Sequence, residues 1–247
     1  MSAATVRPPR AVTLVVPMFN EERSLPHLLD VALDTIPRHA TDWEIVLVDD
    51  ASTDGTSAVA AGRAGSDSRI RIVRHDVNRG LGGALKSGFA AASKEWVLYS
   101  DCDLPWDLDE TGRLFRAVEL TGAGVVSGYR HDRTGEGVLR TAYSFLYNGL
   151  VHLAFGFPIR DVNFSCKLIR RDLLAGLPLE SEGSFIDAEL LVRLRNGGAV
   201  IQQVGLDYFP RTRGVSTLSS PRTILRILRD FVRLTPALRA GRRRLAR

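Results

Sequence analysis

The sequence is poor in cysteine and contains no long apolar run. Its two cysteines, Cys102 and Cys166, are too few for a disulfide framework or for a zinc site made of thiolates alone. No uninterrupted apolar stretch is long enough to span a bilayer. The apolar stretch near the start ends at Pro17 and is followed by acidic residues, which is not a signal-peptide pattern. We therefore expect a cytoplasmic chain in a reducing, intracellular setting.

A net positive charge is also absent outside the C-terminal segment. The whole chain carries +5, whereas residues 221–247 carry nine arginines and one aspartate, so the remaining residues carry −3. On a helix this segment separates basic from apolar side chains: Arg222, Arg226, Arg229 and Arg233 on one face, and Ile224, Ile227, Leu228 and Phe231 on the opposite one. Such a helix either lies on an anionic membrane surface or packs its apolar face on the rest of the protein. In the first case the protein would be peripheral on the inner face of the membrane. No base-reading motif accompanies it, so we do not expect nucleic acid as a partner.

The rest of the chain alternates strand-like and helix-like segments. Apolar runs rich in β-branched residues occur at 11–17, 43–50, 69–75, 95–100 and 122–130, and helical patterns separate them at 21–36, 54–65, 81–93 and 108–120. This alternation predicts a Rossmann-like α/β domain with a mostly parallel sheet and helices on both faces. We expect a flexible N-terminus at 1–10, one domain at 11–220 and the basic helix at 221–247. Further helices are predicted at 138–159 and 185–198.

Polar segments follow each of the five predicted strands. They read PMFNEE, DDASTDGT, HDVNRGLGG, DCDLPWD and GYRHDR in chain order. Sheets of this class bind ligands beyond the carboxyl ends of their strands. Five polar loops on that edge therefore predict a binding site there.

The fourth of these segments places Asp101 and Asp103 one residue apart. Two carboxylates at this distance repel, and a bound cation relieves the repulsion. Hard oxygen ligands suit Mg²⁺ or Mn²⁺, particularly an ion shared with phosphates. Extended backbone would place both side chains on one side. The alternative is that they cap the helix that begins near Asp107.

The second and third segments suggest contacts to a nucleotide. Asp49 and Asp50 are placed to accept hydrogen bonds from a base or a ribose, whereas Asp54 suits a turn or helix cap. Arg79 and Gly80 open a glycine-rich stretch that lets the backbone approach a ligand or a neighbouring helix. Its spacing matches neither of the common phosphate-binding glycine motifs, so a P-loop nucleotidase is disfavoured.

Two segments of the second half carry further candidates. Arg211, Arg213 and Ser216 lie in a glycine-containing loop that suits anionic oxygen atoms, or else is an exposed basic loop. Asp187 and Glu189 lie at a helix start, where acidic residues are favourable for the helix itself. Their functional interpretation is an acid close to an acceptor.

Eight segments of the chain, taken in order, resemble family 2 glycosyltransferases, and most closely the dolichyl- or polyprenyl-phosphate sugar synthases. They are VVPMFNEE, VDDASTDGT, NRGLGGALKSG, SDCDLP, SGYR, DVNFSCKLIRR, IDAELL and RTRGVS, and they extend over residues 11–220. The resemblance implies a GT-A fold, a nucleotide-sugar donor, a divalent cation and inversion at the anomeric carbon. It also implies a lipid-phosphate acceptor.

The resemblance implies roles for individual residues. Pro17, Asn20 and Glu21 match the first donor-binding loop, and Asp49 and Asp50 match the base and ribose contacts. Asp101 and Asp103 match the family's pair of metal-binding aspartates, and Arg130 matches a basic residue after the fifth strand. Asp161 and Lys167 match a stretch near the acceptor, Glu189 matches a helix acid, and Arg211 and Ser216 match a phosphate-binding loop.

Two positions depart from the family pattern. Pro105 replaces a frequent glutamine, so the cation gains a water ligand or binds less tightly, and Thr217 replaces a frequent lysine after Ser216. Contact with an acceptor phosphate then depends on Arg211, Arg213 or Lys167, or else the acceptor differs. A lipid phosphate would itself attack, whereas a hydroxyl acceptor needs a base, for which Asp187 or Glu189 is the candidate. A soluble acceptor and a non-catalytic nucleotide-sugar-binding protein stay as alternatives.

Overall fold

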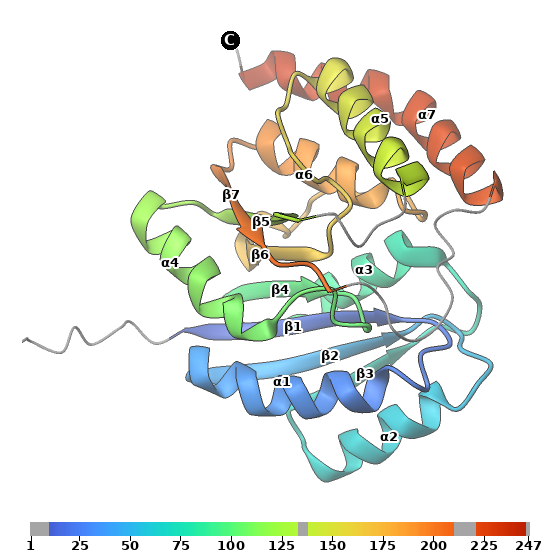
Figure 1. The fold of residues 1–247 in the computed structure, drawn as a ribbon, viewed down its shortest axis with the longest axis vertical. Helices are drawn as coiled ribbons and strands as arrows, with labels where there is room; N and C mark the ends of the chain where they lie inside the picture. The colour runs from blue at the N-terminus through green and yellow to red at the C-terminus, as the bar shows by residue number, and fades with distance from the viewer. Residues whose placement is uncertain (1–9, 133–137, 210–220, 246–247) are drawn as a thin grey trace, which may run out of the picture.

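A computed structural model describes residues 10–132, 138–209 and 221–245. Its centre is a seven-stranded sheet with the order β3-β2-β1-β4-β6-β5-β7, seen in Figure 1. The strands are β1 (Ala11–Met18), β2 (Asp42–Asp49), β3 (Ile70–Arg74), β4 (Trp96–Ser100), β5 (Val125–Arg130), β6 (Cys166–Arg170) and β7 (Ile201–Leu206). Only β6 runs antiparallel to its neighbours β4 and β5. The mostly parallel α/β sheet predicted from the sequence is therefore confirmed.

Helices cover both faces of this sheet because each strand buries side chains in both directions. They are α1 (Leu25–His39), α2 (Thr56–Ser66), α3 (Gly80–Ala91), α4 (Thr111–Thr121), α5 (Val138–Phe155), α6 (Ile186–Asn196) and α7 (Pro221–Leu245), with short 3₁₀ turns at Leu108–Glu110 and Arg171–Leu173. Leu14 and Val16 of β1 belong to the core shared with α1, α2 and α4. Val15 belongs to the core shared with α3, α5, α6 and α7.

The strand order determines where a ligand can bind. The chain proceeds from β1 to β2 and β3 on one side, and then returns to β4 on the other side of β1. The loops after β1 and β4 therefore leave the sheet in opposite directions and open a crevice at its carboxyl edge. The acidic pair that follows β4 lies at this edge.

The ordered body begins earlier than predicted. Arg10, which we assigned to a flexible N-terminus, is buried. Its guanidinium contacts Glu119 and lies 4.5 Å from the centre of the Phe115 ring. Both partners belong to α4, so residue 10 is part of the domain.

Helix α7 packs on the body through one face only. Phe231 contacts the rings of Phe155 and Phe185 at 6.0 and 5.9 Å, and Leu234 and Leu238 are buried. Leu228, which we placed on the apolar face of this helix, is exposed and does not pack on the body. Helices α5 and α7 lie side by side (Figure 1). In the described parts of the chain, no helix has both the length and the apolar character required to cross a membrane.

Candidate functional site

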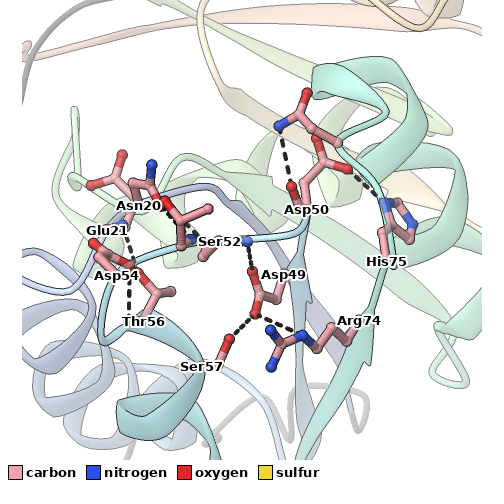
Figure 2. A network of polar contacts seen from close by, with 12 residues as sticks. Asn20, Glu21, Asp49, Asp50, Ser52, Asp54, Thr56, Ser57, Arg74 and His75 are labelled. Atoms are coloured by element: carbon pink, nitrogen blue, oxygen red, sulfur yellow. Dashed lines mark hydrogen bonds and ion pairs between the residues drawn. The ribbon is translucent and has the colours of Figure 1, made fainter.

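The loops after β1 and β2 are joined by hydrogen bonds (Figure 2). The Asn20 side chain accepts from the Thr53 backbone N–H at 2.8 Å, and the Asn20 N–H donates to Ser52 Oγ at 3.0 Å. The Glu21 N–H donates to Thr56 Oγ1 at 2.8 Å. Asn20 and Glu21, which were predicted together with Pro17 to bind the donor, therefore hold the loop after β1 against the loop after β2 at this edge of the crevice.

Asp49 ends β2 with its carboxylate fully buried. Its Oδ1 accepts from the Ser52 N–H at 2.9 Å, its Oδ2 accepts from the Ser57 hydroxyl, and Arg74 Nε lies 3.8 Å away. Burial opposes ionisation, but the hydrogen bonds from the two serines and the charge of Arg74 outweigh it and lower the pKa of Asp49. The carboxylate stays ionised and orders the loop that follows. The base contact expected of it stays a prediction.

Asp50 connects the ends of two strands to the start of α3. Its carboxylate accepts from the backbone N–H of Arg79 at 2.9 Å and of Gly80 at 2.7 Å, and its Oδ1 lies 2.6 Å from His75 Nδ1. Because a carboxylate only accepts, His75 Nδ1 carries the hydrogen, while Nε2 lies 2.8 Å from Ser87 Oγ. Asp50 thus satisfies two N–H groups at the start of α3 that have no partner within the helix. Its predicted ribose contact is untested.

The acidic pair lies in a turn and not in extended backbone. Strand β4 ends at Ser100, and the Leu104 N–H approaches the Asp101 carbonyl at 3.4 Å. The extended backbone that would place Asp101 and Asp103 on one side is therefore absent here. The cap at the 3₁₀ turn belongs to Asp107, whose Oδ1 accepts from the Asp109 N–H at 2.9 Å.

Unusual backbone angles mark the three loops that border the crevice. Among the described residues, positive φ outside glycine occurs at Asn20 (58°), Ala51 (62°) and Leu104 (50°). These three residues follow β1, β2 and β4. Such conformations are costly for L-residues and gather at ligand sites, where the surrounding structure enforces them. The strain supports a functional role for this edge of the sheet.

The pKa of Tyr99 responds to the negative charges of the site. Its hydroxyl donates to Asp101 Oδ1 at 3.2 Å, and the ring is buried. Burial first, and then the negative charges of Asp101, Asp187 and Asp103, raise the pKa of Tyr99 well above its usual value. Asp187 has Lys167 as its partner, so the carboxylates of Asp101 and Asp103 are the ones that favour a further cation in this region.

The residues present fit a divalent cation that is shared with a ligand. Asp101 and Asp103 supply the hard oxygen atoms that Mg²⁺ and Mn²⁺ prefer. Among the described residues, no group of three or more histidine, cysteine, aspartate or glutamate side chains is arranged to hold a metal ion. Two carboxylates do not enclose an ion, so further ligands would come from phosphate oxygens and water.

Lys167 and Asp187 form a buried ion pair behind the acidic loop. Lys167 Nζ lies 2.6 Å from Asp187 Oδ1 and donates to the Phe164 carbonyl at 2.8 Å. Lys167 is opposite Tyr99 in the antiparallel β4–β6 pair, and its Nζ lies 5.4 Å from the centre of that ring. Burial raises the pKa of Asp187, and the charge of Lys167 only partly opposes this. Lys167 has no exposed surface, so the predicted contact with an acceptor is corrected to a charge-balancing role.

Glu189 has a structural role in place of the predicted catalytic one. It is fully buried, and its oxygens accept from the backbone N–H groups of Glu180 and Ser181 at 2.9 and 2.7 Å. Arg193 Nε lies 2.7 Å from Glu189 Oε1. Since both oxygens are engaged away from solvent, Glu189 holds the 180–182 turn, and Asp187 is the stronger candidate for an acid at the site.

Arg130 is paired with Asp161, another residue expected near the acceptor. Its Nε and Nη2 lie 2.6 and 2.8 Å from the two Asp161 oxygens, and its guanidinium lies over the rings of Phe164 and Tyr208. This bidentate, mostly buried pair ties the end of β5 to the segment before β6. The predicted Arg211, Arg213 and Ser216 lie outside the described residues.

Sequence reasoning missed three residues that position the site. Tyr99 contacts Asp101, His75 contacts Asp50, and Trp106 donates to the Ser165 carbonyl at 3.0 Å, which attaches the acidic loop to the start of β6. Each lies at a strand end or in a loop and belongs to a residue type that also occurs often in protein cores. The only available signal was adjacency, because Tyr99 is two residues before Asp101 and His75 ends the third predicted strand.

Gly82 allows α3 to approach the 180–182 turn. Its N–H donates to the Glu182 carbonyl at 2.9 Å, and an added Cβ would lie 2.2 Å from the Ser181 carbonyl oxygen. We expect Gly82→Ala to destabilise the fold by about 1–3 kcal/mol in urea unfolding, because backbone atoms must move. Gly62→Ala is the control: that glycine lies in α2 with no atom within 4 Å of the added Cβ, so we expect a gain of about 0.5–1 kcal/mol. Equal effects of the two changes would contradict this packing.

Comparison with known proteins finds a matching family and relatives that are similar over most of this chain. The family described as "Glycosyl transferase family 2" matches residues 13–177. Glycosyltransferase AglD of Haloferax volcanii is 30% identical over 94% of this chain, which spans 39% of its length. Polyprenol monophosphomannose synthase of Mycolicibacterium smegmatis is 29% identical, with 87% of this chain and 84% of that protein covered.

Solved structures confirm the GT-A type of fold. Glucosyl-3-phosphoglycerate synthase from Mycobacterium tuberculosis, in complex with Mn²⁺ and UDP-glucose, superposes with a TM-score of 0.59 at 25% identity. The match covers 89% of this chain and 78% of that one. Because the family's match extends over well more than half of the residues, the chain belongs to glycosyl transferase family 2.

Proposed function

We propose that the protein is an inverting glycosyltransferase that moves a sugar from a nucleotide-diphosphate sugar to a polyprenyl phosphate. The observation that carries this proposal is the acidic pair Asp101 and Asp103, which lies in a turn at the carboxyl edge of β4 between strained loops. Family membership supports the reaction class. The polyprenol substrate named for one relative supports the acceptor class.

The donor would lie in the crevice beyond β1, β2 and β4. Asp101 and Asp103 would hold Mg²⁺ or Mn²⁺, which when bound offsets the negative charge of the leaving nucleoside diphosphate. The loops joined through Asn20 and Ser52, and the start of α3 held by Asp50, would position the nucleoside and its phosphates. Arg211 and Ser216 remain our candidates for a phosphate-binding loop, and Arg211 for a catalytic contact.

The acceptor determines whether a base is needed. A lipid monophosphate already carries an anionic oxygen, so alignment with the anomeric carbon suffices. A hydroxyl acceptor needs proton removal, and Asp187 is our candidate for that role because burial raises its pKa above the usual value. The Lys167 ion pair keeps a positive charge beside Asp187 in either case.

Helices α5 and α7 supply a surface for a lipid acceptor. Large apolar side chains are exposed on α5, including Phe145 (69%) and Leu153 (81%), and on α7, including Leu225 (69%) and Val232 (71%). Basic and apolar side chains on adjacent helices suit the surface of an anionic membrane. We therefore propose peripheral association with a membrane; an inner-face location stays a prediction.

A donor panel tests this function. The purified chain with Mn²⁺ is incubated with GDP-mannose and with UDP-sugars, with and without polyprenyl phosphate in detergent, and products are identified by mass spectrometry. We expect a glycosyl polyprenyl phosphate with one donor, and no product of that mass without the lipid. Transfer to a soluble acceptor alone would replace the lipid assignment. Binding of a donor with neither transfer nor hydrolysis would favour the non-catalytic alternative.

A further inference from the structure

A pocket between α7 and the first turn of α3 carries several basic side chains. Its volume of about 450 Å³ is within the range of small-ligand sites. Three segments form it: the start of α3, the 180–183 turn and the first half of α7. None of the groups used above for the sugar or the cation comes from α7.

The charges that line this pocket do not cancel. Its three acids all have cationic partners: Glu180 with Arg193 at 2.8 Å, Glu182 with Arg79 and Lys86 at 3.7 Å, and Asp230 with Arg233 at 3.8 Å. Within the described parts of the chain, no carboxylate lies within ion-pair distance of Arg226 or Arg229, the other two arginines of the lining. The lining thus has four arginines and three acids, a net charge of +1, and Arg226 and Arg229 are the two of these arginines without an acidic partner among the described residues.

Arg226 is directed towards the start of α3. An added Cβ on Gly183 would lie 3.1 Å from Arg226 Cδ, and one on Gly80 would lie 3.8 Å from Arg226 Nη1. Both glycines thus leave room for this side chain. The backbone N–H groups of Arg79, Gly80 and Gly82 at this helix end already donate to Asp50 and to the Glu182 carbonyl. The attraction for an anion therefore comes from the arginine side chains.

The surroundings of the pocket indicate the source of the anion. The face of α7 next to the arginines exposes Leu225, Leu228 and Val232, while Leu234 anchors the helix to the body. An anion that carries apolar chains would bind the arginines through its charge and the exposed apolar side chains through its chains. A soluble phosphate would leave those apolar side chains in water. We propose that the pocket binds the phosphate of an anionic phospholipid head group through Arg226 and Arg229. This inference rests on the membrane association proposed above and does not require sugar transfer.

Vesicle sedimentation tests the proposal. The full chain is mixed with phosphatidylcholine vesicles that contain or lack phosphatidylglycerol, and the bound fraction is measured. We expect Arg226→Gln/Arg229→Gln to weaken partitioning onto the anionic vesicles by about 30-fold, since each basic residue close to an anionic surface contributes about fivefold. The control, Arg113→Gln/Arg116→Gln, removes the same charge from α4 on the opposite face of the sheet and should change binding by less than about twofold.

The outcomes separate this basic face of α7 from electrostatic attraction spread over the whole protein. Equal losses in the two double variants, or wild-type binding that does not depend on phosphatidylglycerol, would overturn the proposal. A thermal stabilisation by inorganic phosphate that is lost in Arg226→Gln/Arg229→Gln, without any vesicle binding, would assign the pocket to a soluble phosphate and overturn the lipid source. Transfer to polyprenyl phosphate in detergent is measured in parallel: its absence with intact vesicle binding would remove only the proposed function.

Discussion

Replacing Asp103 with asparagine is expected to lower kcat/KM for the donor by about 1000-fold. A bound divalent cation contributes several kcal/mol to stabilising charge on the leaving group, and each 1.36 kcal/mol is a factor of about ten in rate. Asparagine keeps the size of the side chain but removes its charge, so the remaining carboxylate of Asp101 would hold the ion weakly. The measurements are steady-state kinetics with Mn²⁺ and a titration of Mn²⁺ binding in the absence of the donor.

Asp107→Asn is the matched control for this change. Asp107 belongs to the same loop, is exposed, and uses Oδ1 to accept from the Asp109 N–H. Asparagine can accept the same hydrogen bond, so we expect activity within about twofold of wild type. Full activity in Asp103→Asn, or equal losses in both variants, would contradict the assignment of the acidic pair to a cation.

Replacing Lys167 with methionine is expected to destabilise the fold by about 3–5 kcal/mol, because it leaves the Asp187 carboxylate buried without its partner. The loss should grow with pH. Without Lys167 the pKa of Asp187 rises further above its unfolded value, so the folded state favours the protonated acid and loses stability as pH rises. Urea unfolding at about pH 5.5 and about pH 8 measures both effects.

Lys94→Met separates burial from the loss of an ion pair. Lys94 Nζ lies 2.6 Å from Asp42 Oδ1, the same distance as in the Lys167 pair, but Asp42 is 59% exposed. We expect a cost below about 1 kcal/mol there. The double variant Lys167→Met/Asp187→Asn should recover part of the lost stability, since no charge is left uncompensated. Equal costs for Lys167→Met and Lys94→Met would show that the buried pair is not significant for folding.

The fold was largely predictable from local patterns. Short apolar runs such as AVTLVVP, each followed by helical spacing, imply strands and helices in alternation. The position of β6 was not predictable in this way. It lies antiparallel between β4 and β5, and strand order depends on contacts between residues far apart in the chain. The pairing of Tyr99 with Lys167 follows from that order alone.

The residue types of the candidate site were also visible in the sequence, but their partners were not. Asp49, Asp50, Lys167 and Glu189 were all predicted to contact ligands, and each is buried with partners inside the protein. An ionisable residue near a site contacts the ligand or supports the residues that do. The sequence does not distinguish these two roles, because burial and the partners inside the protein are properties of the packed chain.

The amino-acid sequence by itself determined the alternating elements, the gathering of polar loops at one sheet edge and the acidic pair after β4, because these follow from local periodicity and from the geometry of parallel strands. Only the tertiary structure decided that Asp101 and Asp103 lie in a turn, that Lys167 balances Asp187, and that α7 divides into packed, basic and exposed apolar faces. Those features depend on which distant segments exclude water from each other, and that is settled when the chain packs.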